Sequence, residues 1–375
     1  TSTLGISGPA EVGKVYGSIA DGTARVVKLT NDTHCTTMDS TASIGNAIEW
    51  IQNTTQGGNQ LPASNQIWIW KDVGSLAAFI GVMLLLFPMG ALLLKLPYFR
   101  PLAEPAPEFR GFVGREWWIG AVITTAVGPL LHGWLFTRSQ RAIPPSALWP
   151  QSQTNGYLGV SIAIGVVATI LALFNHFVIT RRRGARAVNY GLTWEKGLDW
   201  GKIGKSLVLA ICILTPAYLI VLLVMSLFKV DFRLGTMALR VMSLPRFKAF
   251  LGYLVPFTFS YFAFTLVLHG FMRAKAGKAS LAIEMLVSVV LWAVGIWVWY
   301  FAQYAPLFFA NRVAGPTMGM VVLRAWSYIL LWPVYALLST YFFRKTGHIY
   351  VGAFLLGLLA TWYIAAQSAF IVAPW

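Results

Sequence analysis

From about Trp70 onward the chain is a series of long apolar runs separated by short polar loops, whereas the residues before it alternate more evenly. A helix needs about 20 apolar residues to cross a bilayer, and we predict about eight such spans. They are Gly74–Leu94, Trp117–Phe136, Tyr157–Thr180, Ser206–Phe228, Phe250–His269, Ala279–Phe301, Met320–Phe343 and Ile349–Val372. The pattern predicts an all-α polytopic membrane domain over residues 66–375.

Composition supports a bilayer as the main partner of this domain. The chain is 57% hydrophobic and only 11% charged, whereas soluble domains have about 25% charged residues. The net charge of +16 would suggest nucleic acid in a soluble protein. Here the basic residues lie in loops between apolar runs, as topology signals and lipid-headgroup contacts do. We therefore expect no nucleic-acid partner.

The distribution of Lys and Arg among the loops predicts a topology. The loops after the first, third, fifth and seventh runs share one side and carry sixteen of these residues, and the opposite loops carry eight. The positive-inside rule places the richer set in the cytoplasm. The sequence thus predicts a multi-pass protein of the cell membrane with both termini on the outer side.

Small residues four apart occur in two of the runs, at Ser161 and Gly165 and at Ala353 and Gly357. This spacing is typical of places where two membrane helices approach closely.

The first 65 residues have a different character and form a separate predicted domain. Ala24–Leu29 reads as a short strand, and a loop containing His34 follows it. After the loop comes a helical pattern with apolar residues at Ile44, Ala47, Ile48 and Ile51, and Ser40 or Thr41 is placed to cap it. The predicted order is therefore strand, histidine loop, helix.

This order resembles the end of an α/β-hydrolase domain, whose triad runs Ser, then Asp or Glu, then His. The stretch YGSIADGTARVVKLTNDTHCTTMDSTASIGNAIEWIQ looks like the last strand, histidine loop and last helix of that family. The later stretches LPASNQIWIWKDVGSLAAFIG, VDFRLGTMALRVMSLPRFKAFLGYLVPFTF and VLHGFMR are similar to bacterial membrane proteins in which an α/β-hydrolase domain precedes a multi-helix membrane domain. The resemblance implies that residues 1–65 are a C-terminal remnant of such a domain.

The resemblance also implies that His34 is the catalytic general base, which takes a proton from a nucleophile and returns it to the leaving group. The sequence contains no G-x-S-x-G nucleophile motif. A serine-type hydrolase therefore requires a preceding part of the protein to supply the nucleophile and the acid. Under this hypothesis the intact protein is a membrane-anchored ester or acyl hydrolase.

The alternative is a non-catalytic membrane subunit, scaffold or transporter-like protein of a larger complex. Its partners would be other membrane subunits, or the remainder of a hydrolase domain docked on residues 1–65. A nucleophile and an acid upstream favour the hydrolase, and a partner packed on residues 1–65 favours the alternative.

Several polar residues within the apolar runs are candidates for function, because such residues are costly in a bilayer. Glu284 and Arg324 lie near helix ends, where they either pair with each other or extend to the membrane interface. His132 and His176 lie on two neighbouring runs, and we expect structural hydrogen bonds for them in preference to a metal or haem site. No Cys or His spacing suits zinc, so the sequence predicts no metal and no cofactor.

Overall fold

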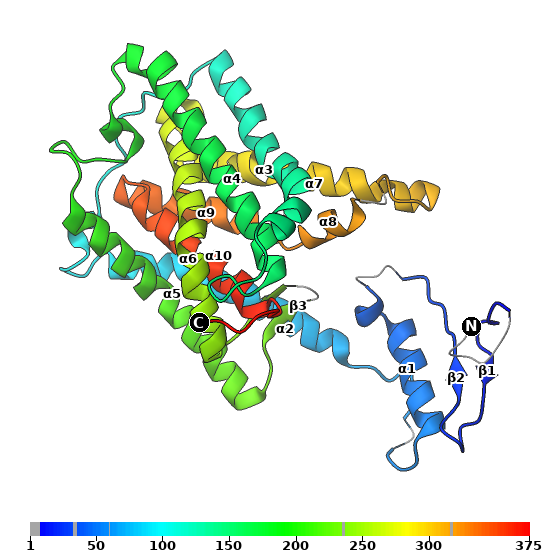
Figure 1. Ribbon diagram of the computed structural model, residues 1–375. Coiled ribbons are helices and arrows are strands. Elements are labelled where there is room, and N and C mark those ends of the chain that lie inside the picture. The colour runs from blue at the N-terminus through cyan, green and yellow to red at the C-terminus, as the bar shows by residue number, and fades with distance from the viewer. Residues whose placement is uncertain (1–7, 33–35, 60, 235–236, 316–317) are drawn as a thin grey trace. The chain divides into compact units, whose positions relative to one another are not determined.

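The computed structural model describes residues 8–32, 36–59, 61–234, 237–315 and 318–375. The chain folds as two compact units, one comprising residues 1–78 with 233–237, and the other residues 79–232 with 238–375. Most of the structure is helical, and the only strands in the described part are two short pairs (Figure 1).

The smaller unit contains a hairpin with strands of two residues each and a helix that is capped at its N-terminus. Strand β1 (Val15–Tyr16) pairs antiparallel with β2 (Arg25–Val26), so the predicted strand Ala24–Leu29 is confirmed only in its first part. A short turn of 3₁₀ helix (Thr37–Asp39) leads to α1 (Thr41–Thr54). The Ser40 hydroxyl accepts a hydrogen bond from the Ser43 N–H at 3.3 Å, which confirms the predicted cap. These elements do not confirm a remnant of an α/β-hydrolase domain.

The remaining helices follow the predicted apolar runs closely. They are α2 (Trp68–Leu93), α3 (Arg115–Ala142), α4 (Ser152–Asn175), α5 (Trp200–Phe228), α6 (Leu244–Leu266), α7 (Leu281–Ala310), α8 (Gly319–Arg324), α9 (Tyr328–Thr346) and α10 (Tyr350–Gln367). Single π-helical turns extend α4 over His176–Thr180 and α6 over Val267–Phe271. Strands β3 (Phe232–Leu234) and β4 (Met237–Leu239) lie in the sequence between α5 and α6.

Seven helices in the described part are long and apolar enough to cross a membrane, namely α2 to α7 and α10. The chain is therefore consistent with a multi-pass membrane protein. The seventh predicted span, Met320–Phe343, is wrong as a single helix, because a turn at residues 325–327 divides it into α8 and α9. Arg324 precedes this turn and Ser327 lies in it, and α9 carries Arg344 and Lys345 at its end, so neither piece is a continuous apolar span.

Helix α10 is the core of the larger unit, because 16 of its 18 residues are buried. It packs against α5, α6 and α9. A Cβ on Gly357 would lie 2.3 Å from Thr258 Oγ1 of α6, and a Cβ on Gly165 of α4 would lie 2.6 Å from the Phe259 ring. These contacts confirm the close helix packing predicted from the two small-residue pairs.

Four loops of the larger unit meet at one end of the helices, which we call the basic face: residues 94–114, 184–199, 272–280 and 347–349. The Arg273 guanidinium joins the first three by donating to the Pro107 and Asn189 carbonyls at 2.7 and 2.8 Å. The Ile349 N–H donates to the Gly191 carbonyl at 3.3 Å. The predicted grouping of these loops is confirmed, and their cytoplasmic location stays a prediction.

Candidate functional site

The turn between α9 and α10 brings distant loops of the basic face together. Helix α9 ends at Gly347, whose φ of +69° is a left-handed conformation that favours glycine. A Cβ at this position would lie 2.4 Å from the Pro105 carbonyl oxygen. The loop before α3 can therefore pass directly over the turn, and this places Glu104 beside His348.

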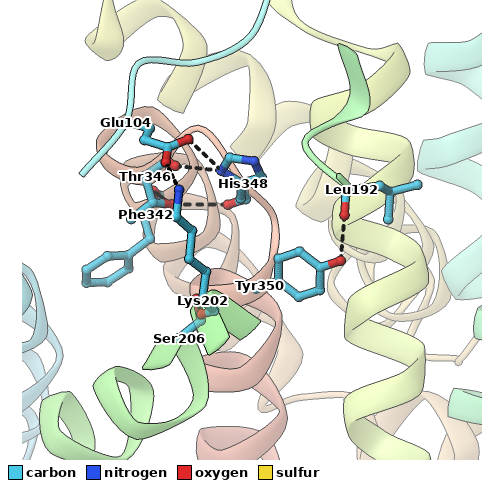
Figure 2. Close-up of polar contacts among 8 residues, drawn as sticks. All are labelled: Glu104, Leu192, Lys202, Ser206, Phe342, Thr346, His348 and Tyr350. Carbon is cyan, nitrogen blue, oxygen red and sulfur yellow. Dashed lines mark hydrogen bonds and ion pairs between the residues drawn. The ribbon is translucent and has the colours of Figure 1, made fainter. Parts of the chain in front are cut away.

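Lys202 approaches the same carboxylate from the start of α5. The Asp199 carboxylate caps this helix by accepting a hydrogen bond from the Lys202 N–H at 2.9 Å. The Lys202 ammonium then forms an ion pair with Glu104, and both side chains are about a third exposed or less, at 25% and 31%. Figure 2 shows Lys202 reaching up to Glu104 from α5, with His348 beside the same carboxylate.

The His348 imidazole lies 3.9 Å from Glu104, measured from Nδ1 to Oε2. Its Nδ1–H donates to the Thr346 carbonyl at 2.9 Å, which fixes the tautomer because a carbonyl only accepts. Burial lowers the pKa of His348 from its ordinary value, and the Glu104 carboxylate opposes this only in part. His348 is therefore mainly neutral at pH 7.

Trp194 forms the aromatic wall of the site. Its ring stacks on His348 with centroids 4.1 Å apart and planes at 20°, and it is nearly parallel to Tyr350 at 5.7 Å. The Lys202 ammonium lies 5.3 Å from the Trp194 ring centroid, within the range of a cation–π contact. The Tyr350 hydroxyl donates to the Leu192 carbonyl at 2.6 Å and holds the stack to the loop before α5 (Figure 2).

Glu104, Trp194, Lys202 and His348 line a cavity of about 760 Å³ at the basic face, which we call the Trp194 cavity. Charges of both signs gather in it: carboxylates from Glu104, Glu195 and Asp199, and ammonium groups from Lys196 and Lys202. Pockets of this size are typical of sites for small organic ligands.

The only residue that the sequence analysis predicted to be catalytic, His34, lies outside the described residues. Nothing in the structure tests its role.

The other candidates have separate structural partners. His132 Nε2 lies 3.3 Å from the Val321 carbonyl, and His176 Nδ1 lies 2.8 Å from the Tyr190 hydroxyl. This agrees with the prediction of structural hydrogen bonds for both. Within the described residues, no group of three or more His, Cys, Asp or Glu side chains is placed to hold a metal ion.

The predicted alternatives for Glu284 are both wrong. Its carboxylate is paired with Arg344 at the end of α9, and its side chain is only 2% exposed, so it neither pairs with Arg324 nor extends to an interface. Arg324 instead donates to the Gln140 side chain at 3.2 Å. Arg324 lies before the start of α9 and Arg344 lies in its last turn, so the length of α9 separates Arg324 from Glu284.

Sequence reasoning missed Glu104, Lys202 and Trp194, because the basic residues around them indicated only topology and lipid-headgroup contacts. One usable signal was present: the chain has only 13 acidic residues, and four of them lie in loops 94–114 and 184–199. Three of these four, Glu104, Glu195 and Asp199, line the cavity. An acidic residue in a strongly basic loop is a candidate for a specific contact.

No family model matches this chain, and no curated protein or solved structure matches it either.

Proposed function

We propose that this chain is a membrane-embedded binding subunit whose Trp194 cavity holds a ligand with both an ammonium group and an anionic group. The observation that carries the proposal is the charge arrangement of the cavity, in which three carboxylates and two ammonium groups line about 760 Å³. A zwitterion can exchange with the ion pair between Glu104 and Lys202 and satisfy both groups at once. A ligand of one sign that breaks this pair leaves one of the two groups without a partner.

The ion pair between Glu104 and Lys202 is suited to exchange with such a ligand. Both side chains are partly exposed, and ion pairs of this kind contribute only about 0–1 kcal/mol. A ligand ammonium can replace Lys202 at the carboxylate while a ligand phosphate or carboxylate binds Lys202. Trp200, which is 74% exposed and lines the cavity, adds an aromatic face for a cation.

The lining supports binding in preference to acyl transfer. Among the described residues that line the cavity there is no Ser, Thr or Cys side chain to act as a nucleophile. His348 lies next to a carboxylate, as a general base often does, but its Nδ1–H is directed to the Thr346 carbonyl.

The test measures binding of free phosphoethanolamine to the detergent-solubilised full chain, and of phosphatidylethanolamine to the same chain in nanodiscs. We expect Lys202→Gln to weaken binding about tenfold or more, because a hydrogen bond to a charged group contributes about 1.5–3 kcal/mol. Glu104→Gln should weaken binding similarly.

The matched control is Glu108→Gln, which removes an exposed ion pair with Arg110 in the same loop without changing the cavity lining. Binding of the free compound indicates a soluble solute, and binding only in nanodiscs indicates a lipid headgroup. Failure of both probes to bind, or unchanged binding by the Lys202 and Glu104 variants, would contradict the proposal.

A membrane-anchored hydrolase is the second candidate, and it is based on the resemblance of residues 16–52 to the end of an α/β-hydrolase domain. Under this hypothesis His34→Ala abolishes ester hydrolysis by the full-length native protein, because no base then activates the nucleophile. Glu49→Gln, which removes an exposed ion pair of α1 with Lys28, is the control. Undiminished hydrolysis by His34→Ala would exclude His34 as the base.

A further inference from the structure

A groove runs between α5 and α6 on the flank of the larger unit. Both helices pack on α10, but they contact each other only sparsely. The space between them is about 430 Å³, and its floor is formed by Leu358 and Trp362 of the buried helix α10. The walls are largely apolar, with Ile211 and Leu214 on α5 and Phe247 and Leu251 on α6 among them.

The few polar atoms of the groove are already bonded within the protein. The Tyr218 hydroxyl accepts from the Met242 N–H at 3.1 Å, and the Trp362 indole donates to the Arg240 carbonyl at 2.8 Å. Thr215 donates to the Ile211 carbonyl of its own helix at 2.8 Å. The groove therefore offers mainly hydrocarbon contact, which suits an acyl chain.

The end of the groove near Phe247 is positively charged. The Arg246 guanidinium donates to the Ala365 and Ser368 carbonyls at 3.2 and 2.9 Å, and the Lys248 ammonium lies 5.6 Å from the Trp375 ring centroid. In the part of the chain described, neither cation has a carboxylate within ion-pair distance. The one nearby acid, Asp231, is paired with Arg240 at 3.1 Å.

We propose that this groove binds one acyl chain of an anionic phospholipid, with the phosphate directed toward Arg246 and Lys248. Three observations point to this occupant: the two walls belong to candidate membrane spans, the lining is apolar to its floor, and unpaired positive charge lies at one end. A zwitterionic lipid satisfies the first two observations and gains less from the third.

The experiment measures lipid retained by the full chain after transfer from nanodiscs of phosphatidylglycerol or of phosphatidylcholine, with native mass spectrometry as the readout. We expect preferential retention of phosphatidylglycerol. Thr215→Trp should fill the groove and remove the retained lipid. Leu219→Trp, one turn further along α5 at a 52% exposed position outside the groove lining, should leave retention unchanged.

The headgroup contact has its own test. Lys248→Gln should lower the preference for phosphatidylglycerol about fivefold, since one basic residue near an anionic lipid contributes about 1 kcal/mol. Lys229→Gln, which removes a positive charge at the end of α5, is the control and should not change the preference. Equal retention of both lipids, or the same loss of lipid in Thr215→Trp and Leu219→Trp, would overturn the proposal.

Discussion

Arg344→Met should lower the free energy of unfolding by about 3–5 kcal/mol, because it leaves a buried carboxylate without its counter-ion. Glu284 is 2% exposed and pairs with Arg344, and its second oxygen has no hydrogen-bond partner among the described residues. The same guanidinium also donates to the Ala279 carbonyl at 3.1 Å. The measurement is the midpoint of thermal unfolding of the purified protein in detergent.

A double variant distinguishes the cost of an unpaired charge from the loss of packing. Glu284→Leu combined with Arg344→Met removes both charges, and we expect it to recover most of the lost stability, because apolar residues often replace a buried ion pair at little cost. If the double variant is as unstable as Arg344→Met alone, the ion pair is not the cause of the destabilisation.

Arg273→Met should destabilise the basic face and abolish ligand binding in the Trp194 cavity. The Arg273 side chain is buried, and it donates to the carbonyls of His269, Pro107 and Asn189 at 2.7–2.8 Å. Burial lowers the pKa of this guanidinium to about 10, so it remains charged at pH 7. Each carbonyl that stays buried without a donor costs about 1–3 kcal/mol.

Limited proteolysis and thermal unfolding check this expectation together. We expect cleavage in loops 94–114 and 184–199 to accelerate, because these loops lose the side chain that joins them. Arg273→Lys is the informative comparison: an ammonium keeps the charge but not the planar fork of donors, so it should recover only part of the stability. Wild-type stability in Arg273→Met would show that other contacts hold the loops.

The sequence by itself determined the features of this protein that depend on neighbouring residues. The positions of the seven long apolar helices follow from continuous runs of hydrophobic side chains, which must be long enough to cross a bilayer, whereas the run Met320–Phe343 is divided by a turn. The cap of α1 is also local, because the Ser40 hydroxyl accepts a hydrogen bond from the N–H of Ser43, three residues further along the chain. The alternation of basic loops identified the four that meet at one end, since successive spans place alternate loops on the same side.

Only the tertiary structure decided which polar groups meet. Glu284 is 60 residues from its partner Arg344, and Lys202 is 98 residues from Glu104. No local pattern encodes such pairs, because they depend on how α9 packs on α7 and on how the Gly347 turn admits the loop that carries Glu104. The Trp194 cavity and the α5–α6 groove are likewise products of packing, since each is lined by segments far apart in the chain and is a space that those segments leave unfilled.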